Sequence, residues 1–130
     1  MSKRRGRLAG EWLARAAWTH ASDDELEATT ALADDSEHAV GCLHAMDVEN
    51  VTSTQLERLQ EVIEILAADC ERVRKHYDEV RERGNPIVAR WLWREWHIGR
   101  TMIGLLNAFS KRQQIISKWQ AIEKLFGREA

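Results

Sequence analysis

The histidines and cysteines near the middle of the chain are the side chains best suited to bind a metal. The candidates are His38, Cys42, His44, Cys70 and His76. Zinc ligands usually occur in close pairs such as Cys-x-x-Cys or His-Glu-x-x-His, and neither spacing is present. If the helices carrying Cys42 and Cys70 are antiparallel, the two thiols lie more than roughly 10 Å apart along the helix axis. We therefore predict no metal site, and we interpret these residues as ordinary, partly buried side chains.

Motifs for catalysis or cofactor binding are also missing from the sequence. There is no Gly-x-Ser-x-Gly element, no Gly-rich loop for phosphate and no cysteine in a recognisable nucleophile context. The paired Glu-x-x-His motifs of helical di-iron bundles do not occur either. We predict that the protein is not an enzyme and that it has no catalytic residues and no cofactor.

Composition indicates one globular domain over residues 1–130. The chain is 44% hydrophobic and 31% charged, with one Pro and seven Gly, a balance typical of folded rather than disordered proteins. It has no apolar run long enough to span a membrane. Two cysteines do not make a disulfide framework, and no apolar core follows the basic N-terminus as in a signal peptide. These features predict a cytoplasmic protein that does not enter the membrane.

Apolar residues recur at helical spacing along nearly the whole chain, which predicts an all-α fold. We expect a compact bundle of about five helices, preceded by a flexible basic arm at residues 1–7. The expected helices cover about 8–19, 22–46, 53–84, 86–109 and 111–126. Ser22 with Glu25, and Ser110 with Gln113, have the spacing of capping boxes and mark two of the helix starts.

The expected third helix has the clearest pattern and ends at a stop-and-start signal. Gly84 suits the left-handed position after a helix, and Pro86 suits the first turn of the next one. The helix carries an apolar heptad seam in which the spacing alternates between three and four residues. Its members are Leu56, Leu59, Ile63, Leu66, Cys70, Val73, Tyr77 and Val80. The seam predicts either a long central hairpin helix packed within its own domain or the contact of a homodimer.

Charge is distributed unevenly although the net charge is only −2. Residues 22–52 contain nine acidic residues and no Lys or Arg, whereas residues 1–21 and 85–130 carry net charges of +4 and +5. One interpretation is that the acidic second helix neutralises the basic termini inside the fold. The alternatives are an acidic surface for a basic partner or a basic surface for phosphates.

The expected fourth helix is apolar around much of its circumference. One stripe consists of Val88, Trp91, Leu92, Ile98, Met102, Leu105 and Phe109. A second stripe consists of Trp93, Trp96 and Ile103, with Arg100 between them. Such a helix is either central in the bundle or covered on one face by another chain. Trp and Arg are enriched in interface hot spots, so we take Trp93, Trp96, Arg100 and Ile103 as candidate partner-binding residues.

The start of this helix resembles a family of phage inhibitors. An Asn-Pro start is followed by closely spaced tryptophans, a small residue and a methionine on an apolar helix. The residues concerned are Asn85, Pro86, Trp91, Trp93, Trp96, Gly99 and Met102. This segment is similar to one in all-helical, dimeric phage anti-CRISPR proteins of the type that inhibits the CRISPR-associated nuclease-helicase. The resemblance implies a non-enzymatic inhibitor that binds a host defence nuclease or helicase and blocks its surface.

The main prediction is therefore a helical protein–protein interaction module, a homodimer that acts as an inhibitor from a phage or mobile element. The alternative is a nucleic-acid-binding regulator, which would use the basic arm and the C-terminal helices to contact phosphates. Its candidate residues are Lys3, Arg4, Arg5, Arg7, Arg94, Arg100, Lys111, Arg112 and Lys118. A structural subunit of a larger assembly is a third possibility.

Overall fold

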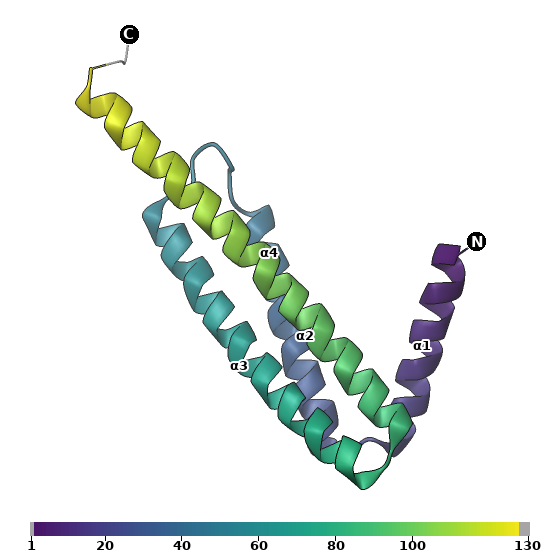
Figure 1. Cartoon of the computed structure of the whole chain (residues 1–130). Coiled ribbons are helices and arrows are strands. Elements are labelled where there is room, and N and C mark those ends of the chain that lie inside the picture. Colours follow the sequence, from purple (N-terminus) through teal and green to yellow (C-terminus); the bar gives the residue numbers. More distant parts are fainter. Residues whose placement is uncertain (1, 128–130) are drawn as a thin grey trace.

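The computed structural model describes residues 2–127 of the backbone and the side chains of residues 11–127. It contains four helices, and no strand occurs within residues 2–127. The helices are α1 (Ser2–His20), α2 (Asp23–His44), α3 (Ser53–Arg83) and α4 (Pro86–Leu125), as labelled in Figure 1. The predicted all-α class is confirmed, but the predicted number of about five helices is wrong.

The helix boundary that we predicted at Ser110 is absent from the structure. Instead of capping a fifth helix, Ser110 and Gln113 lie inside α4, which runs without a break for 40 residues. Both side chains are almost fully buried, at 4% and 3% exposure. The capping pattern describes only a local preference, and packing of one side of α4 against the bundle keeps its backbone helical through this segment.

The predicted helix start at Ser22 and the predicted stop and start at Gly84 and Pro86 are confirmed by hydrogen bonds and backbone geometry. The Glu25 backbone N–H donates to Ser22 Oγ at 3.2 Å, and the Ser22 N–H donates to Glu25 Oε1 at 3.1 Å. In the turn between α3 and α4, Gly84 has the left-handed φ of 78°. The Val88 N–H donates to the Asn85 side chain, which starts α4 directly after α3 has ended. A capping box that we did not predict, Thr52 with Gln55, starts α3.

Helices α3 and α4 form a long antiparallel hairpin (Figure 1). Each of the eight predicted seam residues of α3 is buried or half-buried within this single chain. The side of α4 that is buried also has heptad spacing: Ala89, Leu92, Trp96, Gly99, Ile103, Leu106, Ser110 and Gln113. The α3 seam is thus the contact of an intramolecular hairpin, and it is not available to a second chain.

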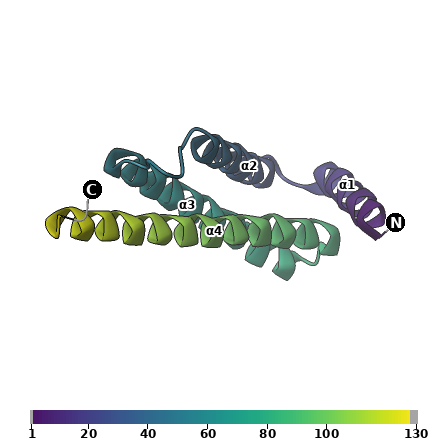
Figure 2. The same cartoon turned by 90° about the horizontal axis from the view of Figure 1, so that it is seen from above.

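Helix α2 packs on this hairpin, whereas α1 diverges from it. Leu32 and Ala39 of α2 are buried in the same core as Leu66 of α3 and Leu92 of α4. Helix α1 packs on α4, where it buries Leu13 and Ala17, and in Figure 1 the two helices then separate as the arms of a V. Figure 2 shows α1 and α2 one after the other on the same side of α4, with α1 reaching beyond the start of α4.

Helix α1 also begins earlier than expected, at Ser2 instead of about Leu8. The part of the predicted arm from residue 2 to residue 7 is therefore included in a helix. The side chains of its basic residues, Lys3, Arg4, Arg5 and Arg7, lie outside the described residues.

Candidate protein-binding surface on α4

The four predicted partner-binding residues do not form one surface. Ile103 is 5% exposed and belongs to the core. Trp96 is half-buried, and the guanidinium of Arg74 from α3 lies 4.9 Å from its ring centroid. Trp93, by contrast, is 45% exposed and stacks on His97, with 5.1 Å between the ring centroids. Arg100 is also exposed. The stripe lies at the edge of the surface that contacts α3. Trp96 and Ile103 are on the side that faces α3, whereas Trp93 and Arg100 face outward.

The other predicted stripe on α4 is divided in the same way. Val88, Trp91 and Leu92 are buried at the start of the helix. Further along, Ile98 and Leu105 are 50% and 66% exposed. Both stripes therefore change environment along the helix, because the neighbouring helices do not cover the same side of α4 throughout its length.

The largest group of exposed apolar side chains lies at the C-terminal end of α4. Ile115, Trp119, Ile122 and Phe126 are 57%, 61%, 43% and 71% exposed. Their spacing of four, three and four residues places them on one side of the helix. All four residues fall within the expected fifth helix, residues 111–126. We call residues 115–126 the overhang.

The overhang exists because α4 is longer than the helix it pairs with. A Cβ atom on Gly99 would lie 2.7 Å from Cys70 Sγ, which places these two seam residues opposite each other. Counting outward from this pair in antiparallel register puts Gln113 opposite Leu56 and residue 116 opposite Ser53, where α3 begins. Beyond that point α4 projects past α3, as the yellow end of the ribbon shows in Figure 1.

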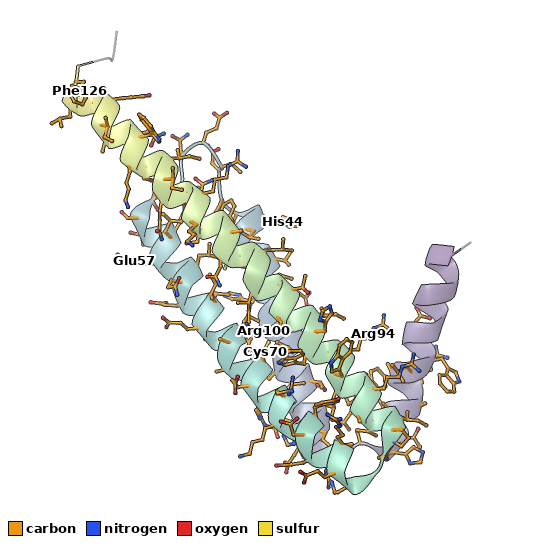
Figure 3. All side chains as sticks on the ribbon, in the orientation of Figure 1. His44, Glu57, Cys70, Arg94, Arg100 and Phe126 are labelled. Carbon is orange, nitrogen blue, oxygen red and sulfur yellow. The ribbon has the colours of Figure 1, made fainter. Side chains whose placement is uncertain are left out.

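A wedge-shaped pocket lies at the other end of α4, where α1 diverges from it. The pocket has a volume of about 370 Å³ and is lined by Trp12, Leu13, Arg90, Trp93 and Arg94. Trp12 is 65% exposed. The side chains in this part of the molecule are drawn as sticks in Figure 3, where Arg94 is labelled. The wedge combines two exposed indole rings with two arginines.

Basic side chains are exposed within the overhang and in the turn of α4 that precedes it. Lys111, Arg112 and Lys118 are exposed. Within the described residues, the ion pairs of α2 reach α3: Glu25 with Arg83 at 3.4 Å and Glu27 with Arg72 at 3.9 Å. These two ion pairs connect α2 with α3, and whether α2 neutralises the basic C-terminal segment stays a prediction.

The candidate metal ligands are scattered. His38 Nε2 lies 3.7 Å from Cys42 Sγ, and His76 pairs with Glu79. Cys70 is buried against Gly99, and this burial raises the pKa of its thiol. Across the described part of the chain, no three His, Cys, Asp or Glu side chains are grouped so that they could hold a metal ion.

One titratable pair was missed at the sequence level. Asp69 of α3 faces Asp35 of α2, and the pKa of Asp69 is raised to about 7, first by burial and then by the Asp35 carboxyl. The Oδ2 atom of Asp69 is buried and has no hydrogen-bond partner among the described residues. Nothing in the heptad pattern identifies this pair, since each aspartate on its own is typical of a solvated helix face.

Comparison with known proteins gives no assignment. The sequence matches no protein-family model, and no curated protein or solved structure shows significant similarity to the chain. None of the helices in the described residues is long and apolar enough to cross a membrane. The exposed surface of α4 is therefore the feature from which a function can be inferred.

Proposed function

We propose that this protein is a non-enzymatic helical module that binds other proteins through the overhang of α4. The observation that carries the proposal is the row of exposed side chains at Ile115, Trp119, Ile122 and Phe126. Large apolar patches of this kind on soluble proteins usually mark interaction sites. A projecting helix end of about 10 residues is also marginal in water unless its apolar side packs on something.

The total accessible surface supports the same proposal. The chain exposes 9664 Å², whereas a compact monomer of 15.0 kDa is expected to expose about 7,000 Å². The projecting end of α4 and the divergent α1 are the visible causes (Figure 1). A binding partner at these places would remove the excess from water.

On this proposal the biological role is that of an inhibitor from a phage or mobile element, acting on a host defence nuclease or helicase. The support is the resemblance of the segment that starts at Asn85 and Pro86 to anti-CRISPR proteins. In the fold, Asn85 caps α4 and Trp91 anchors it in the core. Occlusion of a partner's surface requires no catalytic group from the inhibitor, only a rigid helix with exposed aromatic anchors.

The test is direct binding to a purified CRISPR-associated nuclease-helicase, measured by biolayer interferometry. Trp119→Glu is the test variant, and Trp18→Glu on α1 is the matched control, since Trp18 is similarly exposed at 56%. We expect Trp119→Glu to weaken binding at least about 30-fold, as for a hot-spot residue, and Trp18→Glu to bind like the wild type. Absence of wild-type binding contradicts the inhibitor role, and equal binding by Trp119→Glu contradicts the overhang as the contact surface.

A nucleic-acid-binding regulator is the second candidate, favoured by the exposed Lys111, Arg112 and Lys118 beside Trp119. Basic side chains next to an exposed ring are typical of surfaces that contact phosphates and stack on bases. Anisotropy titrations with a labelled oligonucleotide would test it. This candidate requires affinity that survives at about 200 mM salt and falls in a Lys111→Ala, Arg112→Ala double variant. Binding that vanishes between about 50 and 200 mM salt rules it out as more than a generic attraction.

A further inference from the structure

We infer that the wedge between α1 and α4 binds single-stranded nucleic acid, with its two tryptophans stacking on bases and its two arginines contacting phosphates. The inference goes beyond the proposed function, because the wedge lies at the opposite end of α4 from the overhang. The two surfaces do not overlap, so a protein and a strand can be bound at the same time. Three features of the wedge support the inference: its rings, its charges and the groups that line it.

The indole rings of the wedge come from the two arms of the V, Trp12 from α1 and Trp93 from α4 (Figure 1). His97 stacks on Trp93 with an angle of 3° between the ring planes, so the part of this ring that lines the wedge is not the face that His97 covers. The stack also restrains the Trp93 side chain before a ligand binds, which reduces the entropy lost on binding. Exposed aromatic rings beside basic groups are the usual platforms for the bases of single strands.

Both arms of the V are basic. Helix α1 contains five Lys or Arg residues and one acidic residue, Glu11. The first half of α4, residues 86–105, contains three arginines and one acidic residue, the half-buried Glu95. Arg90 and Arg94 are exposed and form no ion pair within the described side chains, although the charge of Arg94 partly offsets the rise that burial causes in the pKa of Glu95. These charges favour an anionic occupant.

The arrangement of the arginines favours a nucleic-acid strand over an acidic peptide. Arg90 and Arg94 are one turn apart on α4, about 6 Å along the helix axis. Consecutive phosphates of an extended single strand are separated by a similar distance, so each guanidinium can contact one of them. Recognition of an extended peptide relies on hydrogen bonds to the peptide backbone. The described lining of the wedge has no polar side chain other than its indoles and guanidiniums, and therefore offers little for such bonds.

The rings favour a single strand over a duplex. The faces of the bases in a duplex are stacked on one another, whereas in a single strand they are open to an indole ring. The wedge has a volume of about 370 Å³, which is enough for a base and too little for a double helix. Its described lining includes no hydroxyl or amide side chain that would recognise a 2′-hydroxyl, so DNA and RNA strands should bind alike.

The decisive comparison is between Trp12→Ala and Trp18→Ala, two substitutions on the same helix. Both rings are exposed, at 65% and 56%, but only Trp12 lines the wedge. The anisotropy of a labelled oligothymidine of about 12 nucleotides, at about 50 mM salt, should give the wild type a micromolar Kd. Trp12→Ala should weaken binding at least about fivefold through the loss of a stacked base, and Trp18→Ala should bind like the wild type. No binding at about 100 μM protein, or equal binding by the two variants, overturns the inference.

Trp12→Phe separates stacking from folding. A phenyl ring still stacks on a base, so this variant should keep most of the affinity that Trp12→Ala loses. The circular dichroism spectra of the wild type and both variants should show the same helix content. If Trp12→Phe loses as much affinity as Trp12→Ala, the ring does not hold the strand by stacking and the inference is wrong.

The salt dependence tests the phosphate contacts without any change to a tryptophan. Each phosphate contact of a single strand contributes about 0.7 to the slope of log affinity against log salt concentration, so an Arg90→Gln, Arg94→Gln double variant should reduce the slope by about 1.4. Lys111→Gln, Arg112→Gln is the matched control and should keep the wild-type slope. An unchanged slope in the Arg90→Gln, Arg94→Gln variant overturns the inference. If only the control reduces the slope, the strand lies at the C-terminal part of α4, as the nucleic-acid regulator requires.

Competition identifies the occupant. Unlabelled oligothymidine and oligouridine should displace the labelled strand at similar concentrations, and a duplex of the same length should need at least about fivefold more. A duplex that competes equally, an oligouridine that does not compete, or an acidic peptide containing tryptophan that competes better than the strand overturns the inference. Trp119→Glu, which should lose the nuclease-helicase, should bind the strand like the wild type. Failure of the wedge site and failure of the inhibitor role are therefore distinguishable.

Discussion

Gly99 of α4 lies directly against Cys70 of α3, at a place where the two helices leave no room for a methyl group. A Cβ atom on Gly99 would be 2.7 Å from Cys70 Sγ and 3.1 Å from both terminal methyl groups of Leu32. These three residues come from α4, α3 and α2, so the three helices of the bundle meet at this glycine.

We therefore expect Gly99→Ala to destabilise the protein by about 1–3 kcal/mol through overpacking, despite the better helix propensity of alanine. Urea denaturation followed by circular dichroism measures the change. Gly104→Ala is the control, since its added methyl group meets no neighbour. It should stabilise the protein by up to about 1 kcal/mol. Equal stability changes in the two variants would show that α3 and α4 do not approach closely at Gly99.

The α3 seam provides a second prediction about stability. Leu66 is fully buried, whereas its neighbour Ile65 is 50% exposed. Leu66→Ala should lower the free energy of unfolding by about 2–5 kcal/mol, from lost transfer energy and the cavity that remains. Ile65→Ala should change it by less than about 1 kcal/mol. A loss below about 1 kcal/mol for Leu66→Ala would mean that the seam is not packed.

The facing carboxyls of Asp35 and Asp69 predict a dependence of stability on pH. The pKa of Asp69 is raised from 3.8 to about 7 in the folded protein. Its protonated form is therefore favoured by folding, and this contribution to stability is fully present below pH 3.8 and is lost as the pH rises to about 7. The positive charge of Arg72 lowers the pKa of Asp69 and so offsets part of the increase that burial and Asp35 cause.

Asp69→Asn should accordingly raise the melting temperature at pH 8 by a few degrees, corresponding to roughly 1 kcal/mol, and should change it little at pH 4. Thermal melts between pH 4 and pH 8 provide the measurement, with the exposed Asp34→Asn as control. A wild type and Asp69→Asn with parallel pH profiles would show that the two carboxyls do not interact.

Metal removal should have no effect on stability. His38 and Cys42 are close, but the described residues provide no third ligand beside them. We expect the melting temperature to be the same with and without a chelator such as EDTA. A fall of several degrees that added zinc reverses would contradict this prediction and would identify a site involving Cys42 or His44.

Several features of the fold could be predicted from the sequence because their physical causes are local. The helix start at Ser22 depends on a hydrogen bond to a backbone group three residues away, and the turn at Gly84 depends on one residue's backbone freedom. The α3 seam was visible for a related reason: seven of its eight members are large or branched apolar residues or cysteine, and the eighth is a tyrosine.

The partner seam on α4 could not be predicted in this way. Its members include Gly99, Ser110 and Gln113, whose side chains carry no apolar signal. They are buried because α3 lies against them, and only the tertiary structure shows this contact. The same packing carries α4 through Ser110, where the local capping pattern predicted a new helix.

The candidate site was decided by which side of α4 faces α3. Trp93, Trp96 and Trp119 have the same side chain, and their spacing cannot tell which of them is covered. Trp96 is half-buried because it lies on the side of α4 that packs on α3, and Trp119 is exposed because it lies on the outer side of α4, in line with the exposed His97 and Thr101. Sequence periodicity sets which residues share one side of a helix, whereas the packing of neighbouring helices sets which side is removed from water.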